Sequence, residues 1–247
     1  MRSFDQFLTV SLIAISGIVS AQQIQTDRPN ETESPATVSK NSLQVESGFA
    51  FEKEEDEKSI EAPELVLRYG VFKNAEVRLE SAFKITHENN GTDQYGIKPV
   101  TVGAKYHFLD HKNAIPDAAI LARVTVPWLA DNTYQEQKYS PEIRLLAQNG
   151  LSKSSHLSYN LGVHWLPYNL QPEYIYTLSG DYSVTKKVKV LLETYGFAQP
   201  HHHAQNSADV AVLYLINNDL QLDFITGSGI MHSFSDKFIE VGLSFRI

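Results

Sequence analysis

Charged side chains of both signs occur at every second position in several segments of the chain. In residues 75–86, Glu76, Arg78 and Glu80 alternate with apolar neighbours. Side chains two positions apart share one face of an extended strand, so these acids and bases would form a charged stripe. Such a stripe has two interpretations: a structural lattice of ion pairs, or a pore lining whose charges select the solutes that pass.

The histidines offer metal ligands, most densely at His201, His202 and His203. Neutral imidazole binds zinc, copper and nickel. A metal centre needs ligands that converge on one point, whereas three adjacent loop residues point in different directions. No cysteine occurs in the chain, and no fixed carboxylate accompanies the three histidines. We therefore predict no metal site and no cofactor.

Nucleophilic catalysis on a barrel wall would need a serine within hydrogen-bond reach of a histidine. Ser158 and His164 share one face of a predicted strand, but the residues between them place the two about 20 Å apart. His107 and His156 could meet a serine of a neighbouring strand, which the sequence leaves open. Because no G-x-S-x-G motif occurs, we expect a protein that is not an enzyme.

These side chains need elements that hold them on one face, and the chain has a period of two from about residue 41 to its end. In residues 237–247, every second side chain from Ile239 to Ile247 is apolar, while Glu240 and Arg246 belong to the opposite set. A helix has a period of about 3.6 residues and would not separate these sets. We predict twelve strands, at residues 42–52, 60–70, 75–86, 96–108, 116–127, 139–149, 155–166, 173–184, 188–198, 207–217, 219–230 and 237–247.

Many amphipathic strands fit either a soluble sandwich or barrel with an apolar interior, or a membrane barrel with an apolar exterior. The connections favour the second. Odd-numbered connections such as residues 87–96 are mostly longer or more charged, whereas even-numbered ones such as residues 185–187 tend to be tight. Outer-membrane barrels have short periplasmic turns and longer outer loops. The predicted fold class is all-β: a closed antiparallel transmembrane β-barrel of about twelve strands, with both termini on the periplasmic side.

The first residues have the features of an export signal. Arg2 gives a positive start, residues 7–19 form an apolar run too short for a membrane-spanning helix, and small residues precede a predicted cleavage after Ala21. We predict a signal peptide at residues 1–21, an N-terminal extended segment at 22–40 and an outer-membrane β-barrel at 41–247. The formal net charge of −8 argues against nucleic acid as a partner.

Residues 22–40 are charged and have no apolar period. Pro29 and Pro35 each fix a φ angle and restrict the residue before them, so neither a helix nor a strand ladder suits this stretch. A solvated tail and a plug or gate folded into the periplasmic mouth are both open, and we favour the plug. The plug or gate candidates are Asp27, Arg28, Glu31 and Glu33. Their expected partners are Arg68, Arg78, Arg144 or Arg246 for the acids, and Glu46 or Glu240 for Arg28.

If the apolar set faces lipid, the charged set faces the lumen. A twelve-stranded barrel lies between filled eight-stranded barrels and open channels of sixteen strands, so the interior is expected to be partly filled. The lumen-lining candidates are Glu46, Arg68, Glu76, Arg78, Glu80, Arg123, Arg144, Glu193, Glu240 and Arg246.

The stretch QTDRPNETESPATVSKNSLQVESGF at residues 25–49 resembles the start of mature proteins in the family "Putative MetA-pathway of phenol degradation". The resemblance centres on the motifs TDRP and TESP, and beyond this stretch the chain agrees only as a pattern of strands. Members are transporter-like outer-membrane β-barrels, many from Bacteroidetes, so the resemblance implies an outer-membrane location and passage of small molecules. One departure is Ile247 at the C-terminus, where such barrels commonly end on an aromatic residue.

We therefore predict an outer-membrane channel or transporter-like barrel that passes small molecules, hydrophobic or aromatic ones included. The alternatives are a structural or adhesive barrel without transport, and a barrel-wall lipid hydrolase. The expected partners are outer-membrane lipid, a small-molecule solute and, during biogenesis, the barrel-assembly machinery.

Overall fold

The computed structural model describes residues 23–54, 57–88, 91, 93–112, 114–231 and 235–247. Among these residues no helix is long and apolar enough to cross a membrane. The predicted signal peptide, residues 1–21, lies outside the described residues and stays a prediction. The strands are β1 (Leu43–Glu54), β2 (Glu57–Phe72), β3 (Ala75–Glu88), β4 (Asp93–Ile97), β5 (Val100–Leu109), β6 (Asp117–Val126), β7 (Ser140–Gly150), β8 (Ser155–Trp165), β9 (Pro172–Ser183), β10 (Val188–Ala198), β11 (Gln205–Asn217), β12 (Leu220–Met231) and β13 (Ser235–Arg246).

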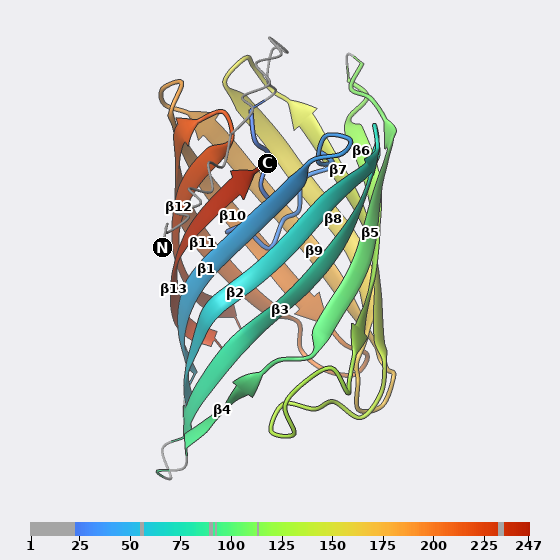
Figure 1. Ribbon diagram of the computed structural model, residues 1–247, viewed down its shortest axis with the longest axis vertical. Coiled ribbons are helices and arrows are strands. Elements are labelled where there is room, and N and C mark those ends of the chain that lie inside the picture. The colour runs from blue at the N-terminus through green and yellow to red at the C-terminus, as the bar shows by residue number, and fades with distance from the viewer. Residues whose placement is uncertain (1–22, 55–56, 89–90, 92, 113, 232–234) are drawn as a thin grey trace, which may run out of the picture.

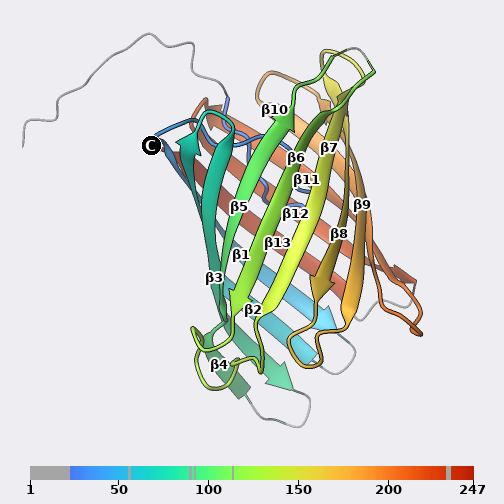
Figure 2. The ribbon, with the colours of Figure 1, turned by 90° about the vertical axis from the view of Figure 1, so that its right-hand side faces the viewer.

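Twelve of these strands close into one antiparallel barrel (Figure 1, Figure 2). Successive strands pair around the ring, and β1 completes it by pairing with β13, with Gln44 opposite Arg246. Closure leaves no unpaired edge in this ring of twelve strands, which lipid requires because no water is present there to satisfy free backbone groups. The predicted fold class, a closed barrel of about twelve strands, is confirmed.

The predicted fourth strand, residues 96–108, is instead two strands. β4 and β5 pair with successive parts of β3, and the break between them falls at Lys98 and Pro99. Pro99 has no N–H to donate to a ladder. The connection between β6 and β7 folds over the break, where the Val100 N–H donates to the Leu129 carbonyl at 3.1 Å.

The two ends of the barrel differ in their connections. The backbones of Leu43 and Ile247 exchange two hydrogen bonds of 2.8 Å, so both ends of the described chain lie at one end of the barrel, here called the terminal end. The tight turns at residues 73–74 and 218–219 also lie there, whereas the long connection at residues 127–139 lies at the opposite end (Figure 1). The predicted loop at residues 53–59 is largely strand, because β1 runs to Glu54 and β2 begins at Glu57.

The wall places apolar side chains outside and charged side chains inside, which is the reverse of the arrangement in a soluble protein. Apolar side chains such as Leu192, which is 64% exposed, point outward, while Arg68 and Glu46 are fully buried inside. An apolar exterior around a charged interior is favourable only where lipid surrounds the wall. The inner face of β10–β13 also carries an apolar patch, made of Leu191, Ala211, Ile225 and Phe238.

Candidate functional site

Residues 23–42, here called the lumen segment, run through the interior of the barrel (Figure 1, dark blue). Its polar side chains Asp27, Thr32 and Glu33 are each at most 6% exposed, and so are Ile24 and Val38. Wall residues from nearly all around the barrel contact the segment. The lumen is therefore partly filled by the chain itself.

The backbone of the lumen segment is held by side chains of the wall. Glu46 accepts from the N–H groups of Asp27 and Arg28 at 3.1 and 2.9 Å, and Glu193 accepts from that of Thr32 at 2.5 Å. Two further bonds run from the Glu33 N–H to Asn160 at 2.8 Å and from the Val38 N–H to Glu76 at 2.7 Å. Buried backbone donors need partners, and inward carboxylates and an amide supply them where no strand does.

Five cations gather on one side of the lumen, beside the acids Glu76, Glu80 and Glu142 of the same strands. These cations, here called the basic wall, are Arg68, Arg78, Lys105, Arg123 and Arg144, on β2, β3, β5, β6 and β7. The Oδ2 atom of Asp27 lies 3.1 Å from a guanidinium nitrogen of Arg68 and 2.6 Å from Nζ of Lys105. A carboxylate of the lumen segment thus joins cations from separate strands.

Glu33 and Glu31 extend this contact around the wall. Glu33 lies 2.5 Å from Arg78 and 3.2 Å from Arg123, and Glu31 lies 2.6 Å from Arg144. Burial opposes ionisation of Glu33, but the charges of the basic wall, led by Arg78, outweigh it and hold the pKa of the Glu33 carboxyl well below its usual range. Glu33 therefore carries its negative charge at neutral pH.

The opposite side of the lumen is negatively charged. Its four carboxylates, here called the acidic wall, are Glu193, Asp209, Asp223 and Glu240, on β10, β11, β12 and β13. Arg28 of the lumen segment lies 3.2 Å from Glu240 and 3.7 Å from Asp223, and also pairs with Glu64 of β2. One guanidinium group therefore serves three carboxylates, two on this wall and one on β2.

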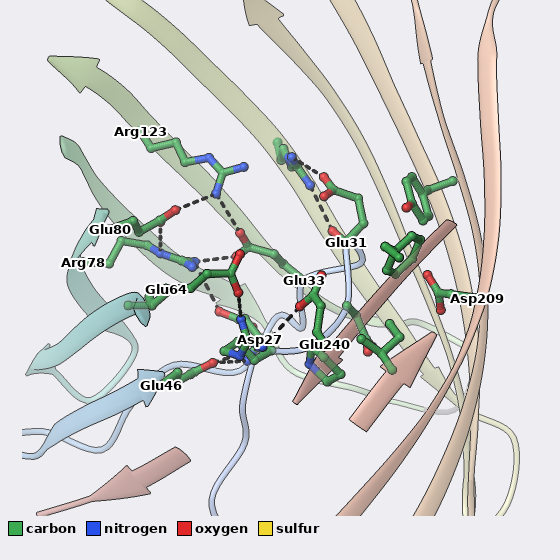
Figure 3. Close-up of a pocket in the computed structure, with 18 residues that line it drawn as sticks. Asp27, Glu31, Glu33, Glu46, Glu64, Arg78, Glu80, Arg123, Asp209 and Glu240 are labelled. Atoms are coloured by element: carbon green, nitrogen blue, oxygen red, sulfur yellow. Dashed lines mark hydrogen bonds and ion pairs between the residues drawn. The ribbon is translucent and has the colours of Figure 1, made fainter. Parts of the chain in front are cut away.

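A cavity of about 230 Å³ lies beside the lumen segment (Figure 3), between Arg78, Arg123 and Arg144 of the basic wall and two residues of the acidic wall. Asp209 and Glu240 line it together with Tyr195, Ile225 and Phe238. A second cavity of about 230 Å³ shares Tyr195, Phe238 and Glu240 with the first. The free space beside the segment is thus bounded by aromatic rings and by charged side chains of both signs, with more carboxylates than cations.

The structure contains most of the contacts expected of the lumen segment. Present are those of Asp27 with Arg68 and Arg78, of Glu31 with Arg144, and of Arg28 with Glu240. Glu46 meets Arg28 through the backbone N–H. Arg246, the remaining expected partner of the acids, lies at the terminal rim, where it pairs with Asp219 at 2.6 Å.

The other predicted lumen residues lie on the inner face, where Glu76 pairs with Arg68, and Glu80 with Arg78 and Arg123. Lys105, Asp209 and Asp223 belong to the inward charged set of the sequence, although they are not among the lumen-lining candidates. The same alternation places them inward, but only the closed ring shows that Lys105 lies against Asp27 and that Asp209 borders a cavity.

A cross-strand serine–histidine pair does occur, with Ser140 in place of Ser158. Ser140 Oγ lies 2.5 Å from His164 Nε2, and His164 Nδ1 lies 3.5 Å from Glu173. Ser140 is only 2% exposed and donates to the Trp165 carbonyl at 2.7 Å. A nucleophile needs access to its substrate and a proton acceptor for its hydroxyl, so this cluster fits a structural role at the end of β7.

Within the described residues, one group of side chains could hold a metal ion: His107, Asp110 and Asp117, whose ligand atoms lie within 4.8 Å of one another. His107 Nδ1 also lies 3.1 Å from the Pro35 carbonyl. The sequence did not indicate this group, because the turn after β5 brings its members together. His201, in an exposed connection, is not part of it.

The fold matches solved outer-membrane proteins at low sequence identity. An outer membrane channel from Pseudomonas putida F1 is 10% identical, with a TM-score of 0.69 over 89% of this chain and 99% of that one. The KdgM porin is 9% identical, with a TM-score of 0.57 over 81% and 98% of the two chains. The NanC porin is 10% identical, with a TM-score of 0.56 over 83% and 100%. No curated protein sequence matches the chain. The class is therefore that of outer-membrane β-barrels.

The family follows from the sequence. The family model described as "Putative MetA-pathway of phenol degradation" matches residues 26–247, from the TDRP motif to the last residue. The chain belongs to this family, as its opening stretch predicts, and its location is the outer membrane.

Proposed function

We propose that this barrel is an outer-membrane channel for small molecules and that the lumen segment is its plug. One observation carries the proposal: a closed barrel holds an extended segment of its own chain in the lumen, with a cavity left beside it. The family description and the likeness to a channel and two porins support a role in passage.

The contacts of the lumen segment suit a part that moves. Ion pairs and hydrogen bonds to a wall can be exchanged for water as a charged segment leaves, whereas apolar packing has no such replacement. The buried apolar residues of the segment are few: Ile24 and Val38, one near each end, and Pro29 and Pro35 between them. We infer that the residues between Ile24 and Val38 shift when a solute passes.

The cavity indicates the size and character of the solute. Its volume of about 230 Å³ lies below the roughly 300–1,000 Å³ of pockets for drug-sized ligands. Tyr195, Ile225 and Phe238 give it an apolar side. We propose that small molecules with an aromatic or other apolar body pass here, in keeping with the family description.

Deleting residues 24–36 tests the plug. Single-channel conductance in planar bilayers should rise, because the deletion removes the part of the chain that fills the lumen, and Arg28→Ala should raise it partially. Heat-modifiable mobility on a gel would show that each variant still forms a barrel. Unchanged conductance of a folded deletion variant would mean that the segment is not a plug.

A reversible tether gives a second test that keeps every charge in place. The hydroxyls of Thr32 and Thr177 lie 2.8 Å apart, and the chain has no cysteine, so Thr32→Cys with Thr177→Cys offers one engineered disulfide between segment and wall. Oxidation should lower conductance and reduction should restore it. The matched control is Ser152→Cys with Ser155→Cys. The hydroxyls of these two serines lie 2.7 Å apart in the β7–β8 connection, outside the lumen. Oxidation of this control should leave the conductance unchanged.

Two alternatives are separated by simple assays. A structural or adhesive barrel would show neither conductance nor solute-driven swelling of liposomes, with or without the lumen segment. A lipid hydrolase would release fatty acid from phospholipid micelles, and Ser140→Ala would abolish that release. Assembly by the barrel-assembly machinery stays a prediction.

A further inference from the structure

We propose that the cavity beside the acidic wall is a binding site for small organic cations, namely ammonium ions with an aromatic or other apolar body. The proposal names a substrate class for the proposed channel, but binding at this site does not depend on conduction. It rests on the charge of the two walls, on an unpartnered carboxylate oxygen and on the shape of the cavity lining.

The lumen segment neutralises one wall and leaves the other short of positive charge. Its acids Asp27, Glu31 and Glu33 all lie against the basic wall, and its arginine, Arg28, is shared among Glu64, Asp223 and Glu240. Glu193 is met by backbone N–H groups of the segment at 3.0 and 2.5 Å. Of the acidic wall, Asp209 and Glu240 line the cavity, and of these two only Glu240 pairs with Arg28.

Asp209 is the residue that argues most directly for a bound cation. It is 8% exposed, it lines the cavity, and its Oδ1 atom has no hydrogen-bond partner in the described part of the chain. Figure 3 shows its carboxylate at the edge of the cavity without an interaction to the other residues drawn. It also faces Glu193 directly across the β10–β11 ladder, where like charges destabilise. A cation in the cavity would pair with the Asp209 carboxylate and relieve this repulsion.

The lining favours an organic cation over a metal ion. Among the described residues, no three ligands of the acidic wall lie close enough to hold a metal, since the one such group is at His107. The cavity instead offers the rings of Tyr195 and Phe238 beside the carboxylates of Asp209 and Glu240. An ammonium group can pair with a carboxylate while aromatic faces attract both the cation and an apolar body.

Calorimetric titration of the purified barrel in detergent tests the site with three probes of one shape. Phenethylammonium should bind, whereas 2-phenylethanol and phenylacetate should bind at least about tenfold more weakly, as expected from the loss of one charged hydrogen bond. Equal affinity for the three probes would overturn the proposal, and so would the absence of measurable phenethylammonium binding.

Variants locate the site. Asp209→Asn and Glu240→Gln should each weaken phenethylammonium binding by about tenfold or more. The matched control is Asp181→Asn. Asp181 lies on the inner face of β9, pairs with His156 and Lys189, and lines neither cavity. This variant should bind phenethylammonium with the same affinity as the unaltered protein. If both variants fold and still bind phenethylammonium with full affinity, the amine binds elsewhere and the proposed site is wrong.

Conductance separates this proposal from the channel itself. A barrel that binds the amine but passes no ions or solutes would refute the channel and leave the cation site standing. A barrel that conducts but binds no amine would refute the cation site alone. With both intact, reversal potentials in a salt gradient should show cation preference, and Asp209→Asn should reduce that preference.

Discussion

The basic and acidic walls of the lumen are built from the same kind of strand and differ in what the lumen segment does for them. On the basic wall, each cation meets carboxylates from the wall, from the segment or from both; Arg68, for instance, contacts Asp27, Glu46 and Glu76. On the acidic wall, Arg28 is shared among carboxylates, and Asp209 keeps an unpartnered oxygen. The charges of the basic wall are thus stabilised by ion pairs, whereas the acidic wall keeps carboxylates that can bind a cation.

The physical lesson concerns buried charge. Removing one partner of a buried ion pair costs about 3–5 kcal/mol, because the remaining charge stays desolvated. The basic wall is therefore expected to be sensitive to every loss of a partner. The acidic wall already holds carboxylates in excess, so losing one of them removes repulsion as well as attraction. Substitutions on the two walls should differ in sign as well as in size.

The largest effect is expected for Arg68→Met. It would leave Asp27, Glu46 and Glu76 around a neutral side chain, and it should lower the free energy of unfolding by about 3–5 kcal/mol. Urea unfolding of the refolded barrel, followed by heat-modifiable mobility, measures this loss. A loss below about 1 kcal/mol would show that water or segment movement compensates, and the basic wall would not be the rigid side of the lumen.

A pair of acid-to-amide variants should separate the walls by sign. Glu142 lies 2.5 Å from Arg144 and 3.0 Å from Arg123, so Glu142→Gln should cost about 1.5–3 kcal/mol, as for a charged hydrogen bond. Asp209→Asn removes a carboxylate that faces Glu193 and should leave stability unchanged or higher. The same urea assay measures both. Equal losses in the two variants would remove the distinction between the walls.

Acid should release the lumen segment from the basic wall. The pKa of Glu33 lies well below its ordinary value of 4.5, so its contribution to docking is complete above that value and is lost as the pH falls through the lowered pKa. Hydrogen-exchange protection of residues 24–38, corrected for intrinsic rates, should hold from pH 7 to about 5 and fall below it. Glu33→Gln should lower protection at neutral pH and remove this part of the acid dependence. Protection lost already between pH 7 and 5 would assign the release to another group.

The smallest effect is expected at the terminal rim. Arg246 pairs there with Asp219, whose side chain is 47% exposed, and partly solvated ion pairs contribute about 0–1 kcal/mol. Arg246→Met should therefore change stability by no more than that amount, which also makes it the control for Arg68→Met. A loss comparable to that of Arg68→Met would mean that position in the lumen does not set the cost.

The local features of this barrel were predictable from the sequence. Alternation of apolar and charged residues depends only on the geometry of an extended chain, so Glu76, Arg78 and Glu80 could be assigned to one face before any strand was paired. The same alternation predicted the twelve strands of the ring, though not the additional strand β4. It missed the break at Lys98 and Pro99, because a strand pattern continues on both sides of a residue that cannot donate to the ladder.

What the tertiary structure decided is how residues far apart in sequence meet. Sequence alone left the N-terminal stretch as a tail or a plug, because its charges suit water as well as a lumen. The closed ring places Asp27 against Arg68 and Lys105, and it leaves Asp209 beside a cavity. Closure also brings β13 beside β1, so that Arg28 reaches Glu64 and Glu240 from opposite ends of the chain. Such contacts depend on the strand number, the stagger and the diameter of the ring, and no local pattern of residues encodes them.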